Sequence, residues 1–341
     1  MKYLTFGELL LRLASPGYTK LFQSDCLDTS FCGAEANVAV SLAMFGEEVK
    51  FITKLPENDI GYSARNSLRY FGVDTSEVLF GGGRMGLYYL EKGASQRPSK
   101  VIYDRKGSAF AQARKKDFDW EIILDGIGWF HWTGINPALS DEMAIVIEDA
   151  CKTAKSKGIT ISCDLNYRGK LWSTDKAQSV MPSLITYADV CICNEEDAEM
   201  ALGIRTTNTN VETAEIDKSN YIDSAKEISE RFGCKYVATT LRKSYSASKN
   251  GWFAMIYDAD TKKAYFSKEY TIDIVDRVGG GDSFAAALIY GIGKQMTCQE
   301  IIDFATASSC LKQTIEGDYN RSTVSDVRAL MKSGGNGRVQ R

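Results

Sequence analysis

The feature that most restricts the fold of this chain is the alternation of short apolar runs with segments of helical periodicity. The apolar runs have the length of strands, are rich in β-branched and aromatic residues, and are mostly apolar on both faces. They comprise residues 3–6, 49–53, 129–133, 160–164, 190–193 and 236–240. Strands of this kind lie inside a parallel sheet that helices cover on both faces. The pattern therefore predicts a three-layer α/β fold with a mostly parallel central sheet.

The helix expected after the third of these runs has recognisable ends. Ser140 fits an N-cap, and Asp141 and Glu142 complement the positive end of the helix dipole. Gly158 marks the end of the helix. Such boundaries support the assignment of helices between the strands.

Two stretches interrupt the alternation. Residues 11–32 and 78–106 are expected to form strands joined by turns, with no helix between them. Antiparallel strands inserted in an α/β domain indicate a small β lid or a dimer surface, and the alternative is that they are edge strands of the main sheet. Apart from this discontinuous insertion, we interpret residues 1–341 as a single domain with a flexible tail at 333–341.

The composition excludes several classes of function. Forty-one Lys and Arg against 44 Asp and Glu give a net charge of −3, without the basic excess that nucleic-acid or anionic-membrane binding usually requires. The single histidine, His131, cannot build a Cys/His zinc cluster, and it lies in an apolar run that predicts a core position. If the chain is an enzyme, its acid and base are therefore expected to be carboxylates.

The nine cysteines are odd in number, scattered, and never spaced C-x-x-C, which is typical of the reducing cytosol. Cys191 and Cys193 would share one face of a strand, where a metal pair is conceivable, but we interpret them as small buried hydrophobic residues. No signal-peptide stretch precedes the first strand, and no run of about 18 apolar residues occurs. We therefore expect a cytoplasmic protein that does not bind membranes.

A glycine-rich segment in the last quarter of the chain indicates chemistry. An apolar strand end is followed by Gly279, Gly280 and Gly281, and then by a helix that begins with Asp282 and Ser283. Consecutive glycines suit a backbone that bends tightly or approaches a ligand, and a helix N-terminus attracts anions. A carboxylate beside such an anion site can accept the proton of a hydroxyl, which predicts phosphoryl transfer to an alcohol. The alternative is a glycine turn with Asp282 as an N-cap.

Other catalytic motifs are absent from the sequence. It contains no G-x-x-x-x-G-K-[ST], no G-x-G-x-x-G after the first strand, and neither H-R-D nor D-F-G. A hydrolase with Ser283 as nucleophile is disfavoured because G-x-S-x-G is incomplete and His131 is the only candidate base.

A second glycine-containing run, residues 31–43, opens a helix of small residues. Gly33 and Asn37 could present a backbone N–H and an amide to sugar hydroxyls, and tight helix packing is the alternative. Together with residues 276–282, this run resembles the paired motifs of the ribokinase/PfkB carbohydrate kinase family. The resemblance spans essentially the whole chain, and residues 55–61, 91–100, 103–105 and 164–168 are similar to the subgroup that acts on 2-keto-3-deoxy sugar acids.

The resemblance implies a ribokinase-like αβα core with a small β lid, and transfer of the γ-phosphoryl group of ATP to the 6-hydroxyl of 2-keto-3-deoxygluconate. Asp282 would be the general base, and the N–H groups of the three glycines would form an anion hole. The implied sugar-binding residues are Gly33, Ala34, Asn37, Tyr89, Tyr103, Arg105 and Arg168. Arg105 and Arg168 suit a substrate carboxylate because a guanidinium binds it through two hydrogen bonds, whereas a surface ion pair is the alternative for each.

The same resemblance implies a nucleotide site and a magnesium site. The residues expected near the nucleotide are Asn166, Asn194, Thr240, Leu241 and Arg242. Asn194 and Asp197 match an N-x-x-E motif that helps to hold Mg²⁺, but Asp replaces Glu, so either Asp197 acts through a water or Glu196 takes part. Arg277 stands where the family usually has Thr, which speaks against a monovalent cation after Asp276.

The resemblance also implies a homo-oligomer formed through the β lid. The partners expected are thus a sugar acid, ATP and further copies of the chain, with no nucleic acid and no membrane. The alternatives are another kinase of the same fold, such as a fructokinase or a 5-dehydro-2-deoxygluconokinase, and a sugar-binding protein without catalytic activity.

Overall fold

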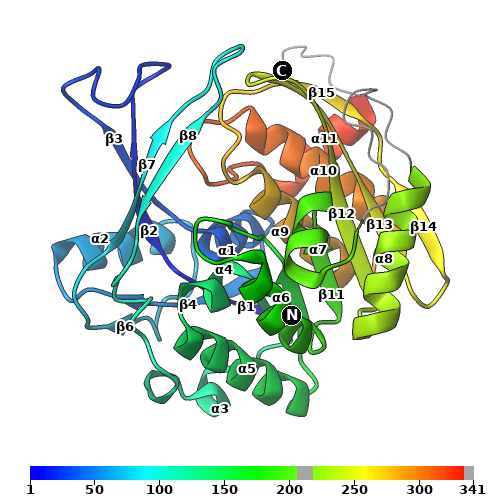
Figure 1. The fold of residues 1–341 in the computed structure, drawn as a ribbon, viewed down its shortest axis with the longest axis horizontal. Helices are drawn as coiled ribbons and strands as arrows, with labels where there is room; N and C mark the ends of the chain where they lie inside the picture. The colour runs from blue at the N-terminus through cyan, green and yellow to red at the C-terminus, as the bar shows by residue number, and fades with distance from the viewer. Residues whose placement is uncertain (206–217, 334–341) are drawn as a thin grey trace.

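A mostly parallel sheet runs through the centre of the structure, a computed structural model that describes residues 1–205 and 218–333 (Figure 1). Its strands are β1 (Lys2–Phe6), β4 (Glu48–Ile52), β9 (Trp129–Thr133), β10 (Thr160–Asp164), β11 (Val190–Cys193), β12 (Tyr236–Ser246), β13 (Lys249–Asp258), β14 (Lys263–Phe266) and β15 (Tyr270–Asp273). Their order is β14-β13-β12-β11-β10-β9-β1-β4, and β15 also pairs with β13. The pairs from β4 to β12 are parallel, whereas β13 pairs antiparallel with its three neighbours.

Helices cover both faces of this sheet, so the predicted three-layer fold is confirmed. On one face, alternate strand residues such as Tyr3 and Phe51 share a hydrophobic core with the first set of helices. This set is α1 (Ala34–Met44), α2 (Asp59–Arg69), α9 (Gly280–Gly293), α10 (Cys298–Gln313) and α11 (Val324–Ser333). On the other face, Leu4 and Phe130 belong to a second core. Its helices are α3 (Trp120–Ile123), α4 (Ile135–Leu139), α5 (Asp141–Ser156), α6 (Thr174–Ile185), α7 (Glu195–Leu202) and α8 (Lys218–Phe232).

The ends of α5 follow from local chemistry. Ser140 is its N-cap, and the Ser140 hydroxyl accepts a hydrogen bond from the backbone N–H of Met143 at 3.1 Å. Gly158, just beyond the helix, has a φ of +69°, a conformation that glycine adopts without the cost of a Cβ. Both ends were predicted from the sequence, and both are confirmed.

A separate four-stranded sheet lies beside the main one (Figure 1). Its strands are β2 (Leu10–Ala14), β3 (Asp28–Cys32), β7 (Gly86–Glu91) and β8 (Lys100–Asp104), in the order β3-β2-β7-β8. The alternative that these strands are edges of the main sheet is therefore wrong. The short β6 (Leu79–Phe80) pairs instead with β5 (Lys54–Leu55), so the second predicted stretch enters the small sheet only at Gly86. Residues 334–341 of the predicted tail lie outside the described residues.

The single histidine is a core residue, as predicted. His131 lies in β9 with 1% of its surface exposed, and its Nδ1 is 2.8 Å from the hydroxyl of Ser162. Desolvation lowers the pKa of His131 to about 3, so the ring is neutral at physiological pH. Cys191 and Cys193 are buried free thiols. Among the helices of residues 1–205 and 218–333, none is both long and apolar enough to cross a bilayer.

Candidate active site

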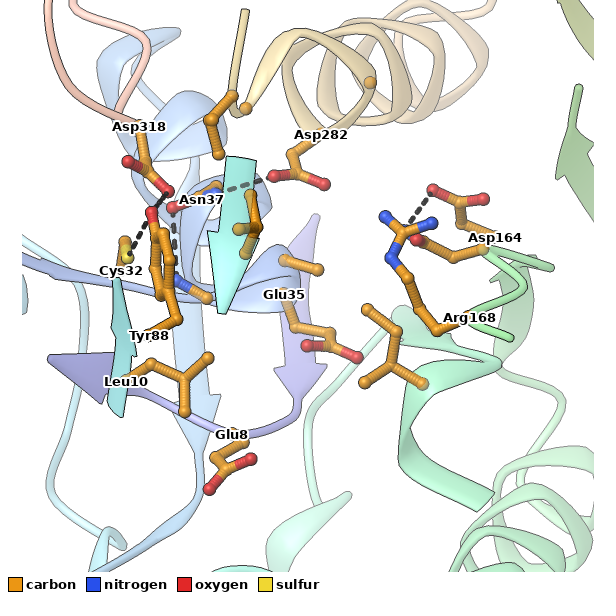
Figure 2. A pocket seen from close by; sticks show the side chains of 18 of the residues that line it. Glu8, Leu10, Cys32, Glu35, Asn37, Tyr88, Asp164, Arg168, Asp282 and Asp318 are labelled. Carbon is orange, nitrogen blue, oxygen red and sulfur yellow. Dashed lines mark hydrogen bonds between the residues drawn. The ribbon is translucent and has the colours of Figure 1, made fainter. Parts of the chain in front are cut away.

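The carboxyl ends of the parallel strands and the small sheet enclose a cavity of about 380 Å³ (Figure 2). This volume falls within the range of small-molecule sites. The side chains that line it include Glu8, Leu10, Cys32, Ala34, Glu35, Asn37, Tyr88, Val101, Tyr103, Arg105, Asp164, Asn166, Arg168, Asn194, Asp197, Thr240, Arg277, Val278, Asp282 and Asp318. A ligand bound at this edge of the sheet faces the ends of several strands, as is usual in open α/β folds.

Asp282 lies in the first turn of α9, close to the motif at the start of α1. The helix begins at Gly280 with Gly279 as its N-cap, so it starts earlier than expected and Asp282 is not the N-cap. Gly279 has a φ of +81°, and a Cβ there would overlap the carbonyl oxygen of Asp318, so the position requires glycine. The Asn37 amide donates a hydrogen bond to the Asp282 carboxylate at 2.6 Å. The two sequence motifs therefore meet at one carboxyl group.

Burial raises the pKa of Asp282 to about 6, although the hydrogen bond from Asn37 lowers it in part. The carboxyl is therefore ionised at neutral pH but is a stronger base than a solvated aspartate. The first N–H groups of a helix have no acceptor within it, and Gly279 and Gly281 both line the cavity. A carboxylate that can accept a proton and N–H groups that can bind an anion thus lie side by side.

Asp164 and Arg168 face Asp282 across the cavity (Figure 2). Burial raises the pKa of Asp164 well above its usual range, and the nearby carboxylates of Asp197 and Asp282 add to this effect. The amide of Asn166 donates to Asp164 at 3.1 Å, while the buried Oδ1 of Asn166 has no hydrogen-bond partner in the part of the chain that the structure describes. Arg168 forms no ion pair with any described residue.

The side of the cavity next to the small sheet carries charges that neutralise one another. The Arg105 guanidinium binds the Glu8 carboxylate through Nη2 at 2.5 Å and Nε at 2.7 Å, and both side chains are buried. The Tyr103 ring lies 5.7 Å from the Arg105 guanidinium. Glu35 accepts a hydrogen bond from the Thr133 hydroxyl at 2.6 Å, and burial raises the pKa of Glu35 to about 7.

Asn194 and Asp197 hold the start of α7. The Asn194 side chain accepts from the N–H of Asp197 at 2.8 Å, and the Asp197 carboxylate accepts from the N–H groups of Asn194 at 3.1 Å and Tyr167 at 2.8 Å. Both residues line the cavity, whereas Glu196 is exposed and does not. Within the described residues, no group of three or more His, Cys, Asp or Glu side chains could hold a metal by itself. A magnesium ion here would therefore rely on one or two carboxylates, water and phosphate oxygens.

Of the nucleotide residues that the resemblance implies on β12, one lines the cavity and two do not. Thr240 lines the cavity, but Leu241 points into the core, because successive strand residues face opposite sides. Arg242 is exposed outside the cavity. Arg277 does line it and donates to the carbonyl of Ala247 at 3.1 Å, and burial together with the like charge of Arg242 lowers the pKa of Arg277.

Most of the remaining predicted site residues lie in the cavity, with two exceptions. Gly280 is not among the lining residues, and its N–H donates to the carbonyl of Arg277 at 3.2 Å. Tyr89 lies on the opposite face of β7 from Tyr88, with its ring 6.4 Å from that of Phe22, so Tyr88 is the residue of this pair that lines the cavity.

Sequence reasoning missed several acidic lining residues. Asp164 could have been found, because it stands at the end of a predicted parallel strand within the run 164–168. Glu8 follows the first strand in the same way. Glu35 belongs to the run 31–43, and the resemblance implies no role for it. Asp318, in the loop after α10, has no local pattern that marks it.

A phosphotransferase that acts on a hydroxyl group is the class of protein that this fold and site define. The pfkB family carbohydrate kinase profile matches residues 4–323, and the chain belongs to that family. The protein is therefore a carbohydrate kinase.

Three proteins are similar to this chain over most of their length and have names that specify a sugar acid. The crystal structure of 2-dehydro-3-deoxygluconokinase from Thermotoga maritima has 47% identity and a TM-score of 0.94, and the match covers 98% of this chain and 100% of that one. The 2-dehydro-3-deoxygalactonokinase of Haloferax volcanii is 29% identical over 97% of this chain and 96% of its own length. The 2-dehydro-3-deoxygluconokinase of Bacillus subtilis is 27% identical over 93% and 90%.

Proposed function

We propose that the protein transfers the γ-phosphoryl group of ATP to the 6-hydroxyl of 2-keto-3-deoxygluconate, which is also called 2-dehydro-3-deoxygluconate. The observation that carries the proposal is the Asp282 carboxylate at the N-terminus of α9, bound to Asn37 in a cavity of small-molecule size. The names of two similar proteins support this sugar acid, and a third name points to its galacto counterpart.

In the proposed reaction, the sugar hydroxyl gives its proton to Asp282 while its oxygen bonds to the γ-phosphorus. The bond between that phosphorus and the bridging oxygen breaks, and ADP leaves with the electron pair. The N–H groups of Gly279 and Gly281 stabilise the charge on the transferred group, because they are oriented before the reaction begins. Asn37 holds the base in place. The products are ADP and the 6-phosphate of the sugar acid.

Mg²⁺ would neutralise the charge of the nucleotide phosphates. The residues that fit its ligand preference are Asp164 and Asp197, with Asn194 beside them, because each places an oxygen ligand at the wall of the cavity. The unpartnered Oδ1 of Asn166 fits the same interpretation, since a buried polar atom calls for a hydrogen-bond partner such as a bound water. Thr240 and Arg277 are the residues proposed to contact the nucleotide.

A neutral sugar is a second candidate acceptor, and the Glu8–Arg105 pair favours it. Because Glu8 already neutralises Arg105, a substrate carboxylate at this end would meet only the remaining donors of that guanidinium. The unpaired Arg168 is then the stronger candidate for the carboxylate of a sugar acid.

A coupled assay for ADP tests both candidates. We expect turnover with 2-keto-3-deoxygluconate to exceed that with fructose, ribose and 5-dehydro-2-deoxygluconate. Arg168→Ala should raise KM for the sugar acid more than for a neutral sugar, and Glu8→Gln, which frees Arg105, should not. Equal turnover with neutral sugars would contradict the proposed substrate. If none of these acceptors stimulated ADP formation, the proposed activity would be contradicted.

We also propose that the outer face of the small sheet joins two copies of the chain. Leu11, Leu13, Tyr89 and Ile102 lie on this face as neighbours in the sheet, and Ile102 is 42% exposed. Phe22, 76% exposed, lies with its ring tilted against that of Tyr89 and extends the apolar surface. Light scattering should give the mass of a dimer for the native chain and a lower mass for Ile102→Glu. A native monomer at micromolar concentration would contradict this proposal.

A further inference from the structure

The turn that carries Asp282 rests on the loop that follows α10. The backbone N–H groups of Val275 and Asp276 donate to the carbonyl of Gln313 at 2.9 and 3.2 Å. A Cβ on Gly279 would overlap the carbonyl of Asp318, so the two backbones are in direct contact. The position of the glycine turn therefore depends on the position of residues 313–318.

Two buried cations join the turn to this loop. Lys312, at the end of α10, has no exposed surface, and its ammonium donates to the carbonyl oxygens of Asp276 at 3.0 Å and Ile315 at 3.3 Å. Arg12, on β2, binds the Asp276 carboxylate at 2.6 Å and also binds the Asp318 carboxylate. The N–H of Gly317 donates to the Asp276 carboxylate at 3.2 Å, so the main chain of the loop also contacts the turn.

The charges in this cluster balance, with Arg12 and Lys312 against Asp276 and Asp318. Among the described residues, Lys312 has no ion-pair partner within 4.0 Å, and the two acceptors of its hydrogen bonds are main-chain carbonyl oxygens. Burying an ammonium costs free energy that a methionine of similar length would avoid, so its packing alone does not account for a lysine here. Carbonyl oxygens that converge from two loops onto one positive charge are the surroundings that a small free cation would also accept.

We propose that Lys312 acts as a tethered cation that positions the Gly279–Asp282 turn, so that turnover needs no free monovalent cation at this place. Lys312 does not line the cavity, so it is a positioning residue and acts through the main chain of Asp276. The inference uses the proposed kinase activity only for its kinetic measurement.

The test compares Lys312→Met with native protein and with Lys294→Met. Lys294 is a matched control, because it follows α9, is 45% exposed, and pairs with Glu47 far from the cavity. For Lys312→Met we expect kcat to fall roughly 10- to 100-fold, since a displaced reacting group costs that much, while KM for the sugar changes little. Ammonium chloride should restore most of the loss, whereas choline chloride at the same ionic strength should not, because choline is too large to enter the site. Native protein and Lys294→Met should respond equally to both salts.

A melting measurement tests the same inference without turnover. The melting temperature of Lys312→Met should rise in ammonium or potassium chloride relative to choline chloride, and that of the native protein should not. A native protein without turnover on any acceptor would refute the proposed function, and the melting comparison would still decide the role of Lys312.

Three results would overturn the inference. The first is stimulation of native turnover by potassium or ammonium several-fold over choline. The second is a kcat of Lys312→Met equal to that of the native protein. The third is a Lys312→Met variant whose loss of kcat, or whose failure to fold, neither cation reverses. Lys312→Gln provides a second variant, with the same expected response to ammonium.

Discussion

The two sides of the cavity differ in how their arginines are neutralised. On the side of the small sheet, Arg105 is bound to Glu8 at 2.5 Å, and Arg12, behind the cavity wall, is bound to Asp276 at 2.6 Å. On the side of α7 and β12, Arg168 and Arg277 line the cavity and Arg242 is exposed outside it. None of the three forms an ion pair with any residue in the described part of the chain.

This difference teaches how one cavity can serve two kinds of ligand. Paired and buried charges keep their geometry before a ligand binds, which lowers the cost of ordering a small polyhydroxy substrate. Guanidinium groups without an ion pair attract anions, so the nucleotide phosphates at Arg277 and the sugar-acid carboxylate at Arg168 would then supply the missing negative charge. The side with Arg105 is thus organised by the protein, whereas the side with Arg168 and Arg277, which includes the proposed nucleotide site, is completed by its ligands.

The largest expected effect comes from Asp282, which lies between the two sides. We expect Asp282→Asn to lower kcat about 1,000-fold, because the variant keeps the shape and the Asn37 contact but cannot accept the proton. Calorimetry should show that the variant still binds the sugar acid and ATP, since neither side loses a partner. Turnover near the native rate would refute Asp282 as the base.

The free energy of unfolding should differ next between variants of the two sides. Arg105→Ala leaves the buried Glu8 without its partner and should lower the free energy of unfolding by about 3 kcal/mol. Arg242→Ala, an exposed residue without an ion pair, should change it by less than about 0.5 kcal/mol. Urea unfolding measures both values. Replacing Glu8 and Arg105 together by Gln should recover part of the loss, and equal effects of the two single variants would remove the distinction.

The nucleotide side should respond mainly in KM. Arg277→Ala is expected to raise KM for ATP roughly tenfold, because one charge-assisted contact to a phosphate is worth about that factor. The KM for the sugar acid should stay within a factor of about two. Initial rates with each substrate varied in turn provide the measurement. A change confined to the KM for the sugar acid would contradict the assignment of Arg277 to the nucleotide side.

The pH dependence has the smallest expected effect. Because the pKa of Asp282 is raised to about 6, the base is ionised above that pH and protonated below it. The value of kcat/KM should therefore fall about five- to sixfold between pH 6 and pH 5, because the ionised fraction of the base drops from about one half to about one eleventh. Glu35, with a pKa of about 7, also titrates in this region, so Glu35→Gln is the control. If Asp282 is the base, the fall of kcat/KM between pH 6 and pH 5 persists in Glu35→Gln.

Local pattern was sufficient to predict the elements of the core. The bounds of β9, β10 and β11 agree with the predicted runs, because continuous apolar runs of this length are a local property of the chain. The β12 strand extends to Ser246, beyond the predicted end, because it pairs with the antiparallel β13. That extension depends on a neighbour that a local window does not contain.

Which side chains face the cavity was harder to predict. Tyr88 and Tyr89 are adjacent and chemically alike, and only the pairing of Tyr88 with Arg12 and Tyr103 in the small sheet decides which one points inward. Leu241 presents the same difficulty next to Thr240. A shift of one residue reverses the face of a strand, and the sequence does not specify that phase in a sheet with apolar residues on both sides.

The amino-acid sequence by itself determined the α/β class and the two paired motifs, and it predicted a carboxylate as the proton acceptor. Only the tertiary structure decided that Asn37 and Asp282, 245 residues apart, lie 2.6 Å from each other. It also decided that Glu8 neutralises Arg105 and that Lys312 is buried against the main chain of Asp276. The physical reason is that periodicity and motifs act over a few residues, whereas charge pairing and desolvation depend on distances that only folding creates.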